Sequence, residues 1–102
     1  MSAADVLKDA LAMISAPHKW AKGAIAFDRH GNQVKPLDEK ACRFCMVGAI
    51  QRLQPNADDY GQAIMILRKA CGSQSIFEFN DQCGHKAMTK VMRRAISYAE
   101  AA

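Results

Sequence analysis

The chain of 102 residues has the length of one ordinary domain and needs neither disulfides nor a metal to bury a core. Half of its residues are apolar and 24% are charged, which excludes a disordered tail, and no apolar run reaches the ~20 residues that cross a bilayer. The net charge of +4 permits a polyanionic partner without requiring one. We therefore expect a single domain over residues 1–102, located in the cytoplasm with its cysteines reduced.

The first predicted element is a helix over about residues 3–15. Ser2 and Asp5 have the spacing of a capping box, in which each side chain binds the backbone N–H of the other residue. Pro17 ends the helix, because the residue before a proline is pushed out of the helical region. Apolar residues recur behind the cap at helical spacing: Val6, Leu7, Ala10, Leu11 and Ile14.

A small β-hairpin is predicted between Trp20 and Pro36. Residues compatible with strands lie on both sides of residues 28–32, whose sequence Asp-Arg-His-Gly-Asn suits a turn. Gly31 is expected to take a positive φ in that turn, since glycine does so without steric cost.

The next helix is predicted to begin after Asp38 as its N-cap and to end before Pro55. Cys42 and Cys45 then fall inside the helix. Gly48 costs a helix interior roughly 1 kcal/mol relative to Ala, so we expect another element to approach the backbone there. The apolar stripe is formed by Ala41, Phe44, Cys45, Gly48, Ala49 and Leu53.

A third helix is predicted from Asn56 to Gly72. The segment that follows, residues 73–79, could form a short strand, a helical turn or a packed loop, and the loop is the favoured interpretation. Asn80 or Asp81 is expected to cap the last helix, whose apolar stripe is the most regular of the chain. The predicted fold class is therefore mostly α, a compact domain of four helices with the small hairpin between the first two.

The spacing of Cys42 and Cys45 raises the question of a zinc site, which needs four nitrogen or sulfur ligands. Cys71 stands alone, and Cys83 with His85 has the wrong gap for a second zinc knuckle. A redox pair of the thioredoxin type belongs at a helix N-terminus after a strand, unlike the mid-helix position expected here. We therefore expect no metal, no cofactor, and buried thiols.

A thiol-dependent enzyme is the remaining chemical alternative. Cys45 or Cys83 would act as the nucleophile beside a histidine, and Asn80 or Asp81 would orient that base. Nothing in the neighbouring sequence marks a substrate pocket or an oxyanion hole, so a non-catalytic protein is the favoured interpretation. The histidines available as bases are His18, His30 and His85.

The last helix carries a basic face made by Lys86, Lys90, Arg93 and Arg94. Cations opposite an apolar stripe can lie along the phosphates of a nucleic acid. Neither a helix-turn-helix spacing nor a set of stacking aromatic residues accompanies them. Nucleic-acid binding is therefore an alternative function rather than the first.

Trp20 is flanked by two lysines, and burial of its ring requires an acceptor for the indole N–H. We hypothesise that the Trp20 segment folds back onto the second helix near Cys45 and Gly48, with Asn80 and Asp81 beside it. Such a junction is either purely structural or the edge of a small binding pocket.

Three parts of the sequence together resemble a family of small uncharacterised proteins of bacteria and their phages. These parts are residues 20–36, residues 41–50, and residues 79–81 with the helix end 93–99. Its members share a Trp and a Gly-Ala before a hairpin, a Cys-x-x-Gly-Ala helix, and an aromatic-Asn-Asp before the last helix. The matching positions are Trp20, Gly23, Ala24, Asp28, Gly31, Cys45, Gly48, Ala49, Asn80 and Asp81.

The chain departs from this pattern at Arg43 and Phe79, where the family usually has Trp. The resemblance implies that Cys45 belongs to the pattern as a lone cysteine, which argues against a metal pair with Cys42. It implies no particular activity.

The sequence thus predicts a small binding protein that acts through protein–protein interaction, with a partner from a phage or its host and no membrane contact. The predicted binding residues are Trp20, Asp28, Cys45, Asn80, Asp81 and His85.

Overall fold

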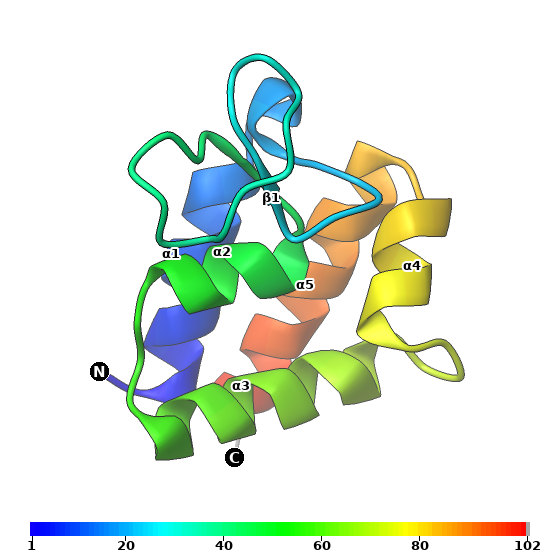
Figure 1. Ribbon diagram of the computed structural model, residues 1–102. Coiled ribbons are helices and arrows are strands. Elements are labelled where there is room, and N and C mark those ends of the chain that lie inside the picture. The colour runs from blue at the N-terminus through cyan, green and yellow to red at the C-terminus, as the bar shows by residue number, and fades with distance from the viewer. Residues whose placement is uncertain (102) are drawn as a thin grey trace.

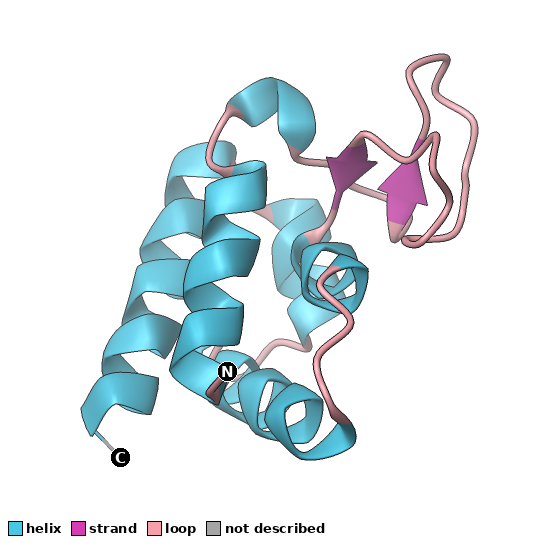
Figure 2. Ribbon diagram, turned by 90° about the vertical axis from the view of Figure 1, so that its left-hand side faces the viewer, coloured by secondary structure: helices cyan, strands magenta, loops and turns pink. Residues whose placement is uncertain are grey.

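The computed structural model describes residues 1–101 and contains, within them, five α-helices and a two-stranded antiparallel sheet (Figure 1). Figure 2 shows the strands and their loops gathered on one side of the helices. No helix in this part of the chain is long and apolar enough to cross a bilayer. The elements are α1 Ala3–Ile14, the 3-10 turn η1 Pro17–Lys19, β1 Ala26–Phe27, β2 Arg43–Phe44, α2 Met46–Arg52, α3 Ala57–Ala70, α4 Ile76–Gln82 and α5 His85–Ala101.

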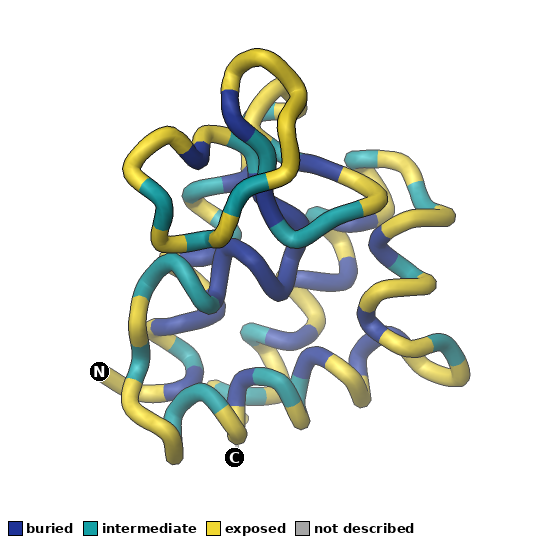
Figure 3. Tube along the Cα trace, viewed as in Figure 1, coloured by how far each residue is buried: buried dark blue, intermediate teal, exposed yellow. Residues whose placement is uncertain are grey.

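The core forms around α1, which packs against α2, α3 and α5. The predicted capping box is confirmed, because Ser2 Oγ accepts the Asp5 N–H and the Asp5 carboxylate accepts the Ser2 N–H. Figure 3 shows buried backbone running through α2 and the inner faces of the long helices. The side chains of Leu7, Ile50 and Met92 are fully buried, so α1, α2 and α5 contribute to one apolar core.

The predicted turn at residues 28–32 is present, and Gly31 has φ +83°. The predicted local hairpin is present in part, since the Val34 N–H donates to the Ala26 carbonyl and the Asp28 N–H donates to the Asn32 carbonyl. Only an isolated bridge joins Phe27 to Gln33, whereas β1 forms its ladder with β2, sixteen residues further on, in the register Phe27 to Arg43. The longer-range pairing buries Phe44 in the core, whereas Val34 of the local hairpin is only partly buried against it.

The second helix begins at Met46, not after Asp38 as the sequence predicted. Residues 43–44 are a strand, and Cys45 is the N-cap of α2 with extended φ and ψ. Its N–H donates to the Ile25 carbonyl at 3.1 Å, so pairing with the neighbouring segment replaces the first expected turns of helix. The two cysteines of the Cys-x-x-Cys pair therefore do not lie inside a helix.

Residues 76–82 form α4, so the interpretation of residues 73–79 as a loop was wrong and the helices number five rather than four within the described residues. Ser75 caps this helix by accepting the Glu78 N–H at 3.1 Å. Asn80 and Asp81 lie within α4 and do not cap the last helix, which begins at His85. The burial of Ile76 and Asn80 in this helix of seven residues outweighs the capping preference of the Asn-Asp pair.

Candidate functional site

Asn80 is the centre of a junction between α4, α2 and the segment that enters β1. Its Oδ1 accepts the Trp20 indole N–H at 2.9 Å and the Met46 backbone N–H at 3.1 Å. Its Nδ2 donates to the Ala21 carbonyl at 2.9 Å and to Asp81 Oδ1 at 3.1 Å. Asn80 is 1% exposed. The carboxamide therefore joins three segments with both of its oxygen lone pairs and both of its N–H groups.

Asp81 and His85 extend this junction on either side of Trp20. Asp81 Oδ1 accepts the Gly23 N–H at 3.0 Å, and His85 Nε2 lies 2.9 Å from the Ile14 carbonyl at the end of α1. The rings of Trp20 and His85 meet edge to face with centroids 5.6 Å apart. These contacts fix the segment after η1 against the start of α5.

Gly48 provides the close approach that its position in a helix predicted. A Cβ built there would lie 2.1 Å from the carbonyl oxygen of Ile25, so only glycine lets the two backbones meet. Cys45 is buried beside it, with its sulfur 3.3 Å from the Gly48 N–H. The hypothesis that the Trp20 segment packs on α2 near these two residues is confirmed.

The junction brings together five of the six predicted binding residues: Trp20, Cys45, Asn80, Asp81 and His85. Among the described residues, every buried side-chain nitrogen or oxygen atom has a hydrogen-bond partner. The geometry thus assigns these side chains a structural task, and their role in binding a partner stays a prediction.

The sixth residue, Asp28, organises the turn at residues 28–32 instead. Its carboxylate accepts the backbone N–H groups of His30 and Asn32 and the Asn32 side-chain amide. The backbone N–H of Asn32 is the main cause that lowers the pKa of Asp28. A lowered pKa means that this carboxylate stabilises the fold above the ordinary pKa of an aspartate and loses that contribution as pH falls through the folded value.

Cys45 is the N-cap of α2 directly after β2, which is closer to the position of a redox pair than the mid-helix position expected from the sequence, but Cys42 lies before the strand. No group of three His, Cys, Asp or Glu side chains within residues 1–101 is arranged to hold a metal ion. Burial raises the pKa of the Cys45 thiol and that of Cys83, and it raises the pKa of Cys71 to about 11. A thiol with a raised pKa supplies less thiolate at neutral pH, which opposes a nucleophilic role.

Alkylation of the native protein by iodoacetamide near pH 7.5 is expected to modify Cys42 first, because it is the exposed cysteine. Cys45 and Cys71 should react only at the rate of unfolding, since they are buried and their pKa values are raised. Mass spectrometry of digested samples measures each site. Fast modification of Cys45 in the folded protein would contradict this placement.

The basic face of α5 is narrower than the sequence predicted. Lys86, Lys90 and Arg93 line one shallow recess of about 490 Å³ together with Thr89. Arg94 does not belong to it, because its guanidinium donates to the Ala70 carbonyl at 3.1 Å. Arg94 thus caps the C-terminal end of α3, where a cation also favours the helix dipole.

This separation predicts different effects for two neighbouring substitutions. Arg94→Ala should lower the free energy of unfolding by about 1 kcal/mol, because the Ala70 carbonyl loses its donor. Arg93→Ala should change stability by about 0.5 kcal/mol or less, as exposed substitutions usually do. Urea titrations of the two variants provide the comparison, and equal stabilities would contradict the capping role of Arg94.

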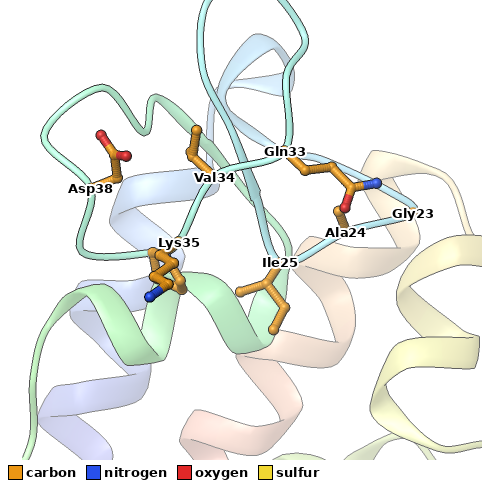
Figure 4. A pocket seen from close by; sticks show the side chains of 8 residues that line it. Gly23, Ala24, Ile25, Gln33, Val34, Lys35 and Asp38 are labelled. Atoms are coloured by element: carbon orange, nitrogen blue, oxygen red, sulfur yellow. The ribbon is translucent and has the colours of Figure 1, made fainter.

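A groove of about 790 Å³, which the sequence did not predict, lies beside the turn-bearing loop. One wall is residues 23–25 and the other is residues 33–36, with Asp38 at one end. The two walls are joined where the Val34 N–H donates to the Ala26 carbonyl, and they then separate (Figure 4). The hairpin pattern in the sequence was the available signal for this groove. It does not show at which residues the hydrogen bonding between the two segments stops.

Comparison with known proteins identifies one family. A family model matches residues 1–98, and its description is "Family of unknown function (DUF6197)". No curated protein and no solved structure matches the chain.

Proposed function

We propose that this chain, which belongs to the family of unknown function DUF6197, is a non-catalytic binding protein that holds an extended segment of a protein partner in the groove between residues 23–25 and 33–36. The observation that carries the proposal is the unpaired main-chain N–H groups on both walls. Within the described residues no hydrogen bond uses the N–H groups of Ala24, Ile25 or Lys35. A strand that enters the groove would pair with such groups, as in β-strand addition.

The side chains of the groove suit a peptide better than a small polar ligand. Ile25, Val34 and Pro36 offer apolar surface, while Lys35 on one wall and Asp38 at the end of the groove carry opposite charges. Main-chain pairing supplies affinity in this binding mode, and alternate side chains of the peptide supply specificity. Charges of both signs beside apolar side chains favour a peptide with both polar and apolar residues over a polyanion.

The junction gives the groove a fixed wall. Gly23 is held by Asp81, and the Ile25 carbonyl rests on the Gly48 backbone and accepts the Cys45 N–H. A wall that does not rearrange reduces the entropy lost on binding, which is the general advantage of preorganised sites. The predicted binding residues of the junction would then support the site rather than contact the partner.

The proposal is tested by selecting binders from a random peptide library displayed on phage and measuring their affinity for matched variants. In Figure 4 the side chain of Gln33 reaches from one wall toward Ala24. Gln33→Trp should therefore fill the groove and weaken peptide binding roughly tenfold or more, a loss of about 1.4 kcal/mol. Gln62→Trp, on the exposed face of α3, is the matched control and should bind like the parent. Equal affinities of the two variants would refute the groove as the site.

Nucleic-acid binding is the second candidate function, and the recess lined by Lys86, Lys90 and Arg93 favours it. Three cations in one recess without an acidic neighbour among its lining residues would neutralise phosphates. The affinity for DNA should then fall steeply with salt concentration, with a slope reduced by about one for each cation removed. A flat salt dependence would eliminate this candidate.

The origin of the partner and the possibility of an enzyme have less structural support. A partner from a phage or its host is supported only by the resemblance in sequence. A thiol-dependent enzyme is the third candidate, and the raised pKa values of Cys45 and Cys83 weigh against it.

A further inference from the structure

A second recess, of about 510 Å³, lies against the turn at residues 28–32. We infer that it is a binding site for a small phosphate-bearing anion, a function separate from the peptide groove. Its volume falls in the range of roughly 300–1,000 Å³ that small-molecule sites have. The lining residues are Asp28, Arg29, His30, Asn32, Lys40 and Cys42.

The cations of this recess are available to a ligand. The ion pair present within residues 1–101 joins Lys8 to Glu100, so neither Arg29 nor Lys40 is neutralised by a carboxylate. Arg29 Nε lies 3.3 Å from His30 Nε2, which accepts this hydrogen bond in its neutral form. The two terminal nitrogens of the guanidinium thus keep their N–H groups free for a bidentate contact, the geometry in which arginine binds phosphate.

Asp28 lines the same recess and offsets one of the two positive charges, so Arg29 and Lys40 leave the recess with a net positive charge. Its two oxygens already accept three hydrogen bonds from His30 and Asn32 inside the turn. The carboxylate oxygens are therefore engaged within their own loop, while Arg29 and Lys40 are exposed. Asn32 donates its amide to Asp28 and keeps its Oδ1 as an acceptor for a protonated group of the ligand.

Phosphate fits this arrangement better than a metal or a nucleic acid. A cation would meet Arg29 and Lys40, and the described residues contain no metal-binding group of acids, histidines and cysteines. A nucleic acid would find its row of cations on α5 instead. The recess at the turn offers one guanidinium and one ammonium, which match a single phosphate or pyrophosphate group.

Cys42 is an internal reporter of this site, because it is the exposed cysteine and lines the recess. Sodium pyrophosphate, added at constant ionic strength, should slow the alkylation of Cys42 by neutral iodoacetamide in a saturable manner. Arg29→Gln and Lys40→Gln should each raise the apparent Kd for pyrophosphate roughly tenfold, as expected for the loss of a charge-assisted hydrogen bond. Inorganic phosphate and adenosine monophosphate, tested in the same way, separate a free anion from a phosphorylated organic molecule.

Lys35→Gln in the groove and Lys90→Gln on α5 are the matched controls, and both should leave the Kd unchanged. Gln33→Trp should also leave it unchanged, so failure of the peptide groove and failure of this site are distinguishable. A Kd that responds to Lys90→Gln rather than Lys40→Gln, or a Cys42 rate that pyrophosphate does not change, would overturn the inference.

Discussion

Gly48→Ala should lower the free energy of unfolding by about 1–3 kcal/mol or more, the usual cost of overpacking. The new Cβ would lie 2.1 Å from the Ile25 carbonyl oxygen and 2.9 Å from its Cγ2. The first of these atoms is backbone, so the segment that enters β1 must move away from α2. Helix propensity alone predicts the opposite sign, because alanine is favoured over glycine by roughly 1 kcal/mol.

Gly61→Ala is the matched control for this prediction. Gly61 also lies inside a helix, α3, but nothing is within 4 Å of the position of its Cβ. That substitution should leave stability unchanged or raise it by up to about 1 kcal/mol. Urea unfolding followed by circular dichroism measures both variants. If Gly48→Ala is as stable as Gly61→Ala, the close approach of the two backbones does not exist in solution.

Asn80→Ala should have the second large effect. The Trp20 indole N–H and the Met46 N–H both lose their acceptor, and the Ala21 carbonyl loses its donor. Each buried polar group left without a partner costs about 1–3 kcal/mol, so we expect a loss of at least about 2 kcal/mol after partial hydration of the exposed side of Trp20.

Gln82→Ala, in the same helix but exposed, is the control and should change stability by about 0.5 kcal/mol or less. The fluorescence of the single tryptophan gives a local readout, since Asn80→Ala should shift the Trp20 emission to longer wavelength as water reaches the indole N–H. Wild-type stability together with an unchanged spectrum would show that the carboxamide does not hold the junction.

Elements with a clear local signal were predicted well from the sequence. The capping box at Ser2 and Asp5 and the N-cap at Asn56 begin helices where expected, because each cap uses a neighbour three residues away. The junction of Trp20 with Asn80 was also predictable. Burial of the Trp20 ring requires an acceptor for the indole N–H, and the carboxamide of Asn80 is one of the groups that can accept it.

The wrong predictions share a different cause. Whether residues 43–45 are helix or strand depends on their pairing with residues 25–27. The spacing of apolar residues in the sequence carries no information about this pairing. Ser75 has a helix-capping signal, but the helix behind it is only seven residues long, too short to be stable without tertiary packing. Arg94 was placed with Arg93 on one face because the distant carbonyl that it caps is not visible in the sequence.

The peptide groove and the recess at the turn were unpredictable for a further reason. Each is bounded by residues from separate parts of the loops, such as Gly23 with Val34, or His30 with Lys40. The space between such residues depends on where hydrogen bonding stops along the chain, and it therefore follows from the three-dimensional path rather than from any local motif.

The most direct test of the groove is a titration of ¹⁵N-labelled protein with a library-selected peptide, followed by ¹H–¹⁵N correlation spectra. We predict that the largest shifts occur at the amides of Ala24, Ile25 and Lys35, whose N–H groups form no hydrogen bond within residues 1–101. The same peptide should cause no such shifts in Gln33→Trp and normal ones in Gln62→Trp. Shifts confined to residues 86–93 of α5, or a library that yields no binding peptide, would contradict a peptide-binding function for this groove.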